Sequence, residues 1–311
     1  MKKAVYNVSI LKNTSGTTLI SARRKRKKMK KVLSLILAVV LCLGCAFAFS
    51  SCGGEAVVSK VGVQKGTTSE MYANMLKGIK VVSYETFALA ANDMKNGNVD
   101  CVIVDKTTAN ALASQISGIK VIDNIPFSSE NYGIGIDPAQ TALKAQIDAI
   151  LENKAAEIQA IKDKYMNGDE DAYVGVTSAT KNVSNAAGQL VVATNAEFAP
   201  WEYASGADDG STVYYGIDME IAKLIAQELN MELVIEDMAF DNVVGSVGKQ
   251  GIDIAMSGIT ITAERLEAIN FSNPYYTESI VVVCNESDTR FDSCGTVVDL
   301  LTIICVASEE E

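Results

Sequence analysis

The 311-residue sequence contains no histidine. This absence excludes Ser-His-Asp and Cys-His catalysis, and it excludes every metal site that depends on an imidazole ligand. Three of the seven cysteines lie within residues 42–52, and the other four, Cys101, Cys284, Cys294 and Cys305, show neither CxxC spacing nor the rhythm of a metal site. The phosphate-binding motif GxxxxGK[ST] is also missing. We therefore expect no metal and no other cofactor.

Positive charge is scarce in most of the chain. The sequence has 27 Lys and Arg against 38 Asp and Glu, a net charge of −11. Residues 1–52 hold 11 of the basic residues and no acid, so the rest of the chain carries a net charge of −22. Because such a surface repels a phosphate backbone, nucleic-acid binding by the folded part is excluded.

The first 52 residues are typical of an export signal. Eight of the nine residues 23–31 are basic, and residues 32–49 form an uncharged run. Met29 is the expected start of translation. The run FSSCGG resembles a bacterial lipobox and predicts lipidation of Cys52. Two alternatives remain open: cleavage after Ala48 without a lipid, or retention of the 18-residue run as a membrane anchor. Each alternative places the folded part outside the cytoplasmic membrane.

After residue 55, short apolar runs alternate with helical patterns. The chain has 48% hydrophobic and 21% charged residues, and its length is typical of about two domains. The runs predict buried parallel strands at 60–63, 99–104, 120–122, 190–193, 232–235 and 252–256. Apolar spacing predicts helices at 140–153 and 216–230, the second with Asp218 as its cap and Asn230 at its stop. The expected fold is α/β, with mostly parallel sheets flanked by helices, and ligands on such sheets bind beyond the carboxyl ends of the strands.

One segment combines the features of an anion site. In SGITITAER, residues 257–265, a buried strand ends and a helix begins. Gly258 allows a ligand to approach the backbone, Thr260 adds a hydroxyl, and Arg265 offers a planar fork that matches a carboxylate. The alternative is a surface arginine paired with Glu264 or Glu267.

Other candidate residues also follow predicted strands. Asn195 and Phe198 lie in the loop after 190–193, and Phe240 follows 232–235; an aromatic wall for a ligand and ordinary packing are both open. Gln64 precedes a Gly/Thr turn with Thr67 and Thr68 that starts a helix and suits an anion. Asp105 ends a strand and either pairs with an ammonium or caps the helix 107–114.

Together these segments resemble the polar amino-acid-binding proteins of ABC importers, bacterial solute-binding family 3. The resemblance rests on LVVATNAEFAPWEY, YYGIDMEIAKLIAQEL, DIAMSGITITAERLEAINFSNPYY, VGVQKGTTSE and NVDCVIVDKTTANA. It implies a two-lobed periplasmic-binding fold of type II with hinge crossovers. The segments stand in circularly permuted order, although the back half of one binding protein fused to the front half of another would give the same order.

The resemblance also implies a division of the chain. The second lobe covers 56–126, the return to the first lobe 127–166, a linker 167–188, and the first lobe 189–284. The tail 285–311 is irregular, and 297–306 is expected to form one more strand of the second lobe.

By the same resemblance, each candidate residue receives a role. Arg265 clamps the α-carboxylate of a free amino acid, helped by Thr260 and by Thr68. Asp105 and the Gly258 carbonyl hold the α-ammonium, with Thr260 sharing. Phe198 and Phe240 stack against the ligand. Asn195 and Gln64 contact the ligand side chain, and Thr67 lies beside them.

The implied function is capture of a polar, glutamine-like amino acid and its delivery to an ABC importer permease. The protein is then an extracytoplasmic, lipid-anchored binding protein and no enzyme. Three alternatives remain: a rearranged remnant that binds nothing, an exported enzyme on the same fold with Glu197 as its acid, and a receptor input module.

Overall fold

A computed structural model describes residues 58–124, 128–182, 188–207, 210–294 and 296–304. The export signal, Met29, Cys52 and Cys305 lie outside these ranges. None of the helices within them combines the length and the apolar character that crossing a membrane requires.

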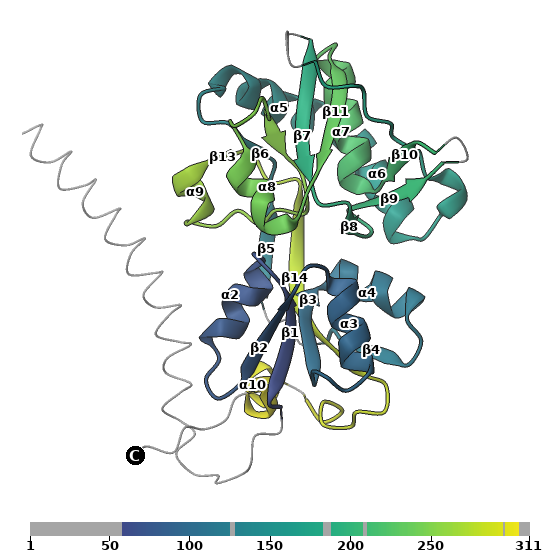
Figure 1. The fold of residues 1–311 in the computed structure, drawn as a ribbon, viewed down its shortest axis with the longest axis vertical. Helices are drawn as coiled ribbons and strands as arrows, with labels where there is room; N and C mark the ends of the chain where they lie inside the picture. The colour runs from purple at the N-terminus through teal and green to yellow at the C-terminus, as the bar shows by residue number, and fades with distance from the viewer. Residues whose placement is uncertain (1–57, 125–127, 183–187, 208–209, 295, 305–311) are drawn as a thin grey trace, which may run out of the picture. The chain divides into compact units, whose positions relative to one another are not determined.

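The described residues form two lobes, each built on its own sheet (Figure 1). The sheet of the second lobe has the order β2-β1-β3-β14-β4. Its strands are β1 (Lys60–Gln64), β2 (Lys80–Tyr84), β3 (Cys101–Asp105), β4 (Ile119–Ile122) and β14 (Tyr276–Asn285). β1 pairs in parallel with β2 and β3, whereas β14 is antiparallel to β3 and β4. Residues 276–285, which the sequence groups with the first lobe, therefore reach into the sheet of the second.

Helices cover both faces of this sheet. The helices α3 (Phe87–Lys95) and α4 (Lys106–Gln115) pack apolar side chains on one face, and α2 (Thr68–Met75) packs on the other. The expected strand at 297–306 is wrong, because the structure forms the helix α10 (Val297–Ile304) there. Leu300 and Ile304, four residues apart on one side of α10, are both fully buried against β1, β3 and β14. Because a helix satisfies its own backbone hydrogen bonds, it can bury these two side chains without leaving the unpaired edge that a further strand would have.

The sheet of the first lobe has the order β11-β7-β12-β6-β13. Its strands are β6 (Gly135–Ile136), β7 (Gln189–Thr194), β11 (Glu232–Asp237), β12 (Ile254–Ala255) and β13 (Asn270–Phe271). One face is covered by α5 (Thr141–Asn153), α6 (Ala155–Met166) and α7 (Ile217–Glu228), and the other by α8 (Phe240–Ser246). The short elements β8 (Glu197–Phe198), β9 (Glu202–Gly206), β10 (Thr212–Tyr215), η1 (Glu170–Ala172) and α9 (Arg265–Ala268) complete the lobe.

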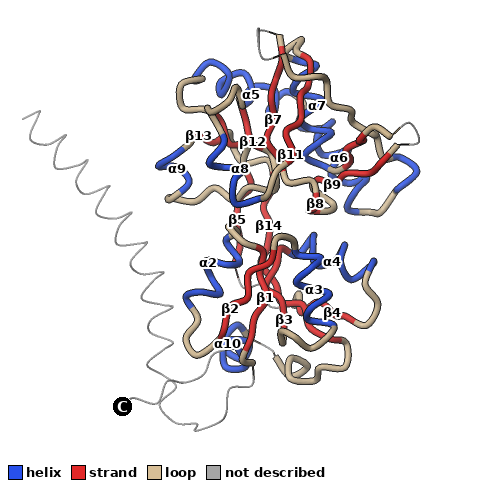
Figure 2. Tube along the Cα trace, in the orientation of Figure 1, coloured by secondary structure: helices blue, strands red, loops and turns tan. Residues whose placement is uncertain are grey.

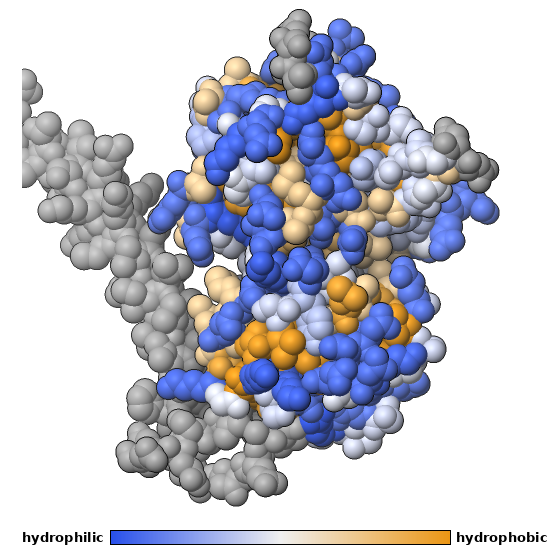
Figure 3. Space-filling view, in the orientation of Figure 1, coloured by the Kyte–Doolittle hydropathy of each residue, from blue (hydrophilic) through white to orange (hydrophobic). Residues whose placement is uncertain are grey.

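Two strands connect the lobes. β5 (Ser128–Tyr132) pairs with β14 in an antiparallel ladder, and Figures 1 and 2 both show these strands side by side between the two sheets. Hydrophilic side chains cover much of the face in Figure 3, and hydrophobic ones gather over the second lobe. The crossover strands fix where the two lobes meet.

The two ends of α7 (Ile217–Glu228) test the sequence signals for helix start and stop. Asn230, expected at the stop of α7, adopts a φ of 54° just after the helix, where the left-handed region suits asparagine. Asp218 does not cap α7, contrary to expectation. The N-cap position is Gly216, and the buried Asp218 carboxylate accepts hydrogen bonds from the Gly258 N–H at 2.8 Å and from the Tyr275 hydroxyl. It therefore supports a loop of the cleft.

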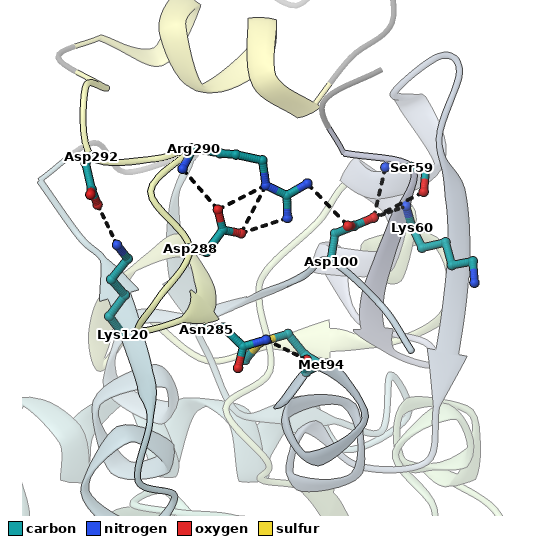
Figure 4. A network of polar contacts seen from close by, with 9 residues as sticks. All are labelled: Ser59, Lys60, Met94, Asp100, Lys120, Asn285, Asp288, Arg290 and Asp292. Carbon is teal, nitrogen blue, oxygen red and sulfur yellow. Dashed lines mark hydrogen bonds and ion pairs between the residues drawn. The ribbon is translucent and has the colours of Figure 1, made fainter. Parts of the chain in front are cut away.

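Hydrogen bonds and an ion pair connect the segment after β14 to the start of β1 (Figure 4). Arg290 donates hydrogen bonds to Asp288, at 2.7 Å from Nη2, and to Asp100, at 3.3 Å from Nη1. The other Asp100 oxygen accepts the backbone N–H groups of Ser59 and Lys60, both at 2.9 Å. Asp100 thus joins the first described strand to the last part of the chain.

Replacing Asp100 should destabilise the fold measurably. Asp100→Ala removes the side-chain acceptor of two backbone N–H groups and one of the two carboxylate partners of Arg290, which costs about 1–3 kcal/mol of unfolding free energy. The control is Asp292→Ala, which removes only the exposed ion pair with Lys120 and should cost less than about 1 kcal/mol. Urea unfolding measures the free energy of unfolding of both variants, and equal losses of this free energy would contradict the role of Asp100.

Candidate functional site

Nine of the ten predicted site residues line one cavity between the lobes. They are Gln64, Thr67, Thr68, Asp105, Phe198, Phe240, Gly258, Thr260 and Arg265. The second lobe contributes the first four, from the ends of β1 and β3 and the start of α2, and the first lobe contributes the rest. The cavity has a volume of about 10 Å³, which is room for about one water molecule and far less than an amino acid needs.

Several contacts hold the lobes together around this cavity. Gln64 Nε2 donates to Asn195 Oδ1 at 3.0 Å, and the indole N–H of Trp201 donates to the Thr107 hydroxyl at 2.8 Å. At the rim, Lys65 Nζ lies 2.7 Å from the Asp241 carboxylate. These contacts join opposite lobes, so admission of a ligand requires them to separate.

Arg265 provides the cation of the cavity. It is the first residue of α9, its Nη1 donates to the Thr260 carbonyl at 2.9 Å, and its Nη2 donates across the cleft to the Gly66 carbonyl at 3.1 Å. The guanidinium carbon lies 5.7 Å from the centre of the Phe240 ring. Burial lowers the pKa of Arg265, while the nearby Glu130 and Asp105 act to raise it. The guanidinium therefore bonds to carbonyls that a carboxylate can replace, instead of to Glu264 or Glu267.

Asp105 provides the acid. It ends β3 with a side chain 5% exposed, and its Oδ1 accepts the hydroxyl proton of Tyr132. Asp105 occupies the N-cap position of α4, but its side chain makes no capping bond. Burial, and after it the nearby Glu278 carboxylate, raise the pKa of Asp105 to about 8. An uncompensated acid of this kind is suited to an ammonium partner.

The aromatic residues and Gly258 form a tight wall. Phe198 and Phe240 are both buried to more than nine-tenths. Gly258 has a φ of 52°, and a Cβ atom built on it would lie 2.6 Å from Cε1 of Phe198. Any side chain at position 258 would therefore push the Phe198 ring aside, which is a physical reason for glycine here.

Asn195 is the predicted residue that does not line the cavity. It lies behind Gln64, accepting from Gln64 Nε2 and donating its own amide to the Met238 carbonyl at 3.0 Å. Thr67 caps α2, because its hydroxyl accepts the Glu70 N–H at 3.2 Å. Both residues thus have local roles in holding the cavity walls.

Sequence reasoning missed the acids and donors behind the cavity. Glu130 on β5 and Glu278 on β14 are 5% and 2% exposed. Glu130 accepts hydrogen bonds from Thr68 and Thr260, and Glu278 from the Thr107 hydroxyl. The predicted return to the first lobe at 127–166 contains both Glu130 and Tyr132, whereas nothing in the sequence marks which acids become buried.

Glu197, the acid of the enzyme alternative, and the nearby Glu202 are both absent from the cavity lining. Glu197 is exposed on β8, and the fully buried Glu202 accepts the hydroxyl of Ser257. Burial raises the pKa of Glu202 well above its usual range, with Asp218 adding to the effect. Within the part of the chain that the structure describes, His, Cys, Asp and Glu side chains form no cluster able to hold a metal ion.

The charge on Asp105 should cost stability as pH rises. Its pKa is higher in the folded protein than the unfolded value of about 3.9, so its stabilising protonated form is complete below about pH 4 and is lost up to about pH 8. Asp105→Asn keeps an acceptor for Tyr132 without the charge. It should stabilise the protein by at least about 1 kcal/mol at pH 8 and by much less at pH 4–5.

Urea unfolding at both pH values measures this gain. The control is Asp169→Asn, an exposed acid whose removal should have no pH-dependent effect of this size. A gain from Asp105→Asn that is the same at pH 5 and pH 8 would contradict the assignment.

Comparison with known proteins adds an independent result. The sequence model of the bacterial extracellular solute-binding proteins, family 3, matches residues 190–300. The arginine-binding extracellular protein ArtP of Bacillus subtilis is 32% identical over 30% of this chain and 35% of its own length. Cyclohexadienyl dehydratase of Pseudomonas aeruginosa is 32% identical over 34% of this chain and 38% of its own length. The chain thus spans little more than a third of these relatives.

A solved structure extends the comparison. Domain 1 of TmArgBP in its arginine-bound form is 30% identical, with 40% of this chain and 98% of that domain covered and a TM-score of 0.26. The family match, 190–300, includes β7, α7, the SGITIT loop and Arg265. Residues 190–300, most of the first lobe, are therefore similar in sequence to the bacterial extracellular solute-binding proteins of family 3.

Proposed function

We propose that this protein captures a free amino acid between its two lobes and delivers it to an ABC importer. The observation that carries the proposal is the meeting of one cation, Arg265, and one acid, Asp105, in a cavity lined by both lobes. A zwitterion needs one fixed charge of each sign together with backbone dipoles. The carbonyls of Thr260 and Gly66, which accept hydrogen bonds from Arg265, mark where the ligand carboxylate would bind.

Ligand uptake follows from the hinge. The crossover strands β5 and β14 connect the lobes, so separation of the lobes opens the cavity without breaking either sheet. The ligand would first meet Arg265 and Thr260 on the first lobe. Closure would then bring Asp105 and Thr68 from the second lobe, and the closed form would be presented to the permease.

The finer features of the proposal concern place, ligand and chain order. Lipidation of Cys52 would hold the protein at the outer side of the cytoplasmic membrane, close to its permease. Asn195 behind Gln64 favours a polar neutral side chain such as that of glutamine. The permuted order of the segments is part of the proposal, since β1 to β4 precede the first-lobe sheet in the chain.

The enzyme alternative has one finding in its favour, the similarity to cyclohexadienyl dehydratase. The acid it would use, Glu197, is exposed and does not line the cavity. The positions of Arg265 and Asp105 therefore support binding better than catalysis by Glu197.

Calorimetric titration of the purified protein with the twenty amino acids tests the proposal. One-to-one saturable binding is the expected result, and it would name the ligand. Absence of heat from every amino acid, in a sample that is folded by circular dichroism, would favour the remnant alternative.

Arg265→Ala should weaken binding of that amino acid by at least about a hundredfold, because the ligand carboxylate loses its one fixed cation while buried. Lys249→Ala is the control, since it removes an equal charge from an exposed position of the first lobe. Circular dichroism of both variants checks the fold. Binding by Arg265→Ala within a few-fold of the unsubstituted protein would refute the site.

A further inference from the structure

Glu130 lies behind the cavity at the junction of the lobes. It belongs to the crossover strand β5 and is 5% exposed. Its Oε2 accepts the hydroxyl of Thr68 at 2.7 Å and the hydroxyl of Thr260 at 2.6 Å. Both threonines line the cavity, one from each lobe, whereas Glu130 does not. These two hydroxyls of the cavity lining donate hydrogen bonds to Glu130, and through them Glu130 can set which hydrogen bonds a ligand makes.

Each threonine hydroxyl has a single proton, and its direction decides whether the hydroxyl donates or accepts a hydrogen bond in the cavity. A threonine hydroxyl has one proton to donate and two lone pairs that accept. Because Thr68 and Thr260 both donate that proton to Glu130, they present only lone pairs to the cavity. A ligand carboxylate also only accepts, so it gains no hydrogen bond from either hydroxyl. An ammonium or guanidinium N–H group does.

The surrounding charges favour the same kind of ligand group. The β5–β14 ladder places Glu130 directly opposite Glu278, and both are buried. Asp105 is the third buried acid here, and Arg265 is the one basic residue among the nine that line the cavity. The Oε1 atom of Glu130 is buried and has no hydrogen-bond partner. The buried acids outnumber Arg265, so a second cation, brought by the ligand, would stabilise their ionised forms.

We infer that Glu130 is a positioning residue that makes Thr68 and Thr260 hydrogen-bond acceptors toward a cationic N–H group of the ligand, leaving the ligand carboxylate to Arg265. This inference rests on the proposed amino-acid-binding function. It changes the expected role of both threonines, which the sequence assigned mainly to the carboxylate. The cationic group is either the α-ammonium or a charged side chain, and the choice of probes separates the two.

Three probes differ by one group each. Arginine carries the α-ammonium and a guanidinium, citrulline replaces the guanidinium by a neutral urea, and 5-guanidinopentanoate lacks the α-ammonium. Their affinities are measured by calorimetry for the unsubstituted protein and for Glu130→Gln. Both threonines contact the same oxygen, Oε2, whereas Oε1 has no hydrogen-bond partner. The glutamine NH2 group is therefore expected at the Oε2 position, where its two N–H groups donate to the two hydroxyls, and the carbonyl at the Oε1 position. Both hydroxyl protons are then freed toward the cavity.

Selective loss of affinity is the expected result. Glu130→Gln should weaken arginine by at least about thirtyfold, and it should leave one other probe within about threefold. If the spared probe is citrulline, the hydroxyls face the ligand side chain. If it is 5-guanidinopentanoate, they face the α-ammonium. Equal losses for all three probes, or no loss, would overturn the inference, since a merely structural role does not distinguish among them.

Glu85→Gln is the matched control. Glu85 is exposed near the cleft, and only its main-chain carbonyl contacts a lining residue, Gln64. The substitution Glu85→Gln removes the same charge without altering a contact to either threonine, and it should leave the affinities for all three probes within about twofold. A selective loss in Glu85→Gln as well would mean that net charge alone explains the result, and would overturn the role of the hydroxyls.

A measurement without ligand separates this inference from the proposed function. Neutron diffraction from deuterated crystals should locate the hydroxyl deuterons of Thr68 and Thr260 on the Glu130 side. Deuterons directed into the cavity would overturn the inference even if amino acids bind. If no probe binds but the deuterons face Glu130, the amino-acid function fails and the ligand class fails with it, while the polarity of the hydroxyls stands.

Discussion

The ladder between β5 and β14 positions nearly every group of the cleft. β14 pairs with β5 over its first half and with β3 over its second half, and Ile280 is the residue at which the two pairings meet, opposite both Ser128 and Asp105. The hinge and the second-lobe sheet are therefore parts of one hydrogen-bonded structure. The end of β3, and with it Asp105, cannot shift without disturbing the crossover.

The same ladder explains why the cleft is rich in buried acids. Register places Glu130 against Glu278, and Tyr132 next along β5 reaches Asp105 with its hydroxyl. Hydroxyl groups donate to one oxygen of each of these acids, so the acids are oriented by neutral donors and not by lysine or arginine. Neutral donors orient a carboxyl group without supplying a countercharge. The acids of the cleft thus keep no cationic partner of their own, and Arg265 is the one base among the cavity-lining residues.

Sequence predicted the features that depend on neighbours along the chain. Buried strands such as β3 and β7, the helix α7 and the strand-end residues Arg265 and Asp105 follow from apolar period and loop position, and the structure places them as expected. The features it missed depend on contacts distant in sequence. The helix α10 forms because Leu300 and Ile304 meet a sheet whose strands β1 and β3 lie far earlier in the chain, and Asp218 leaves its capping role because it meets Gly258. The burial of Glu130 likewise arises only when both lobes surround β5.

The arrangement of the strands makes the first lobe an insertion into the second. β1 to β4 are formed before residue 123, but β14, which lies between β3 and β4, and α10, which covers one face, come from residues 276–304. The sheet of the second lobe therefore lacks the strand that joins β3 to β4 until the chain has passed through the first-lobe sheet. Because long-range strand pairing is slow compared with local pairing, the second lobe is expected to complete its folding last. The cleft then forms at the end of folding, since half of its walls belong to the lobe that begins first and finishes last.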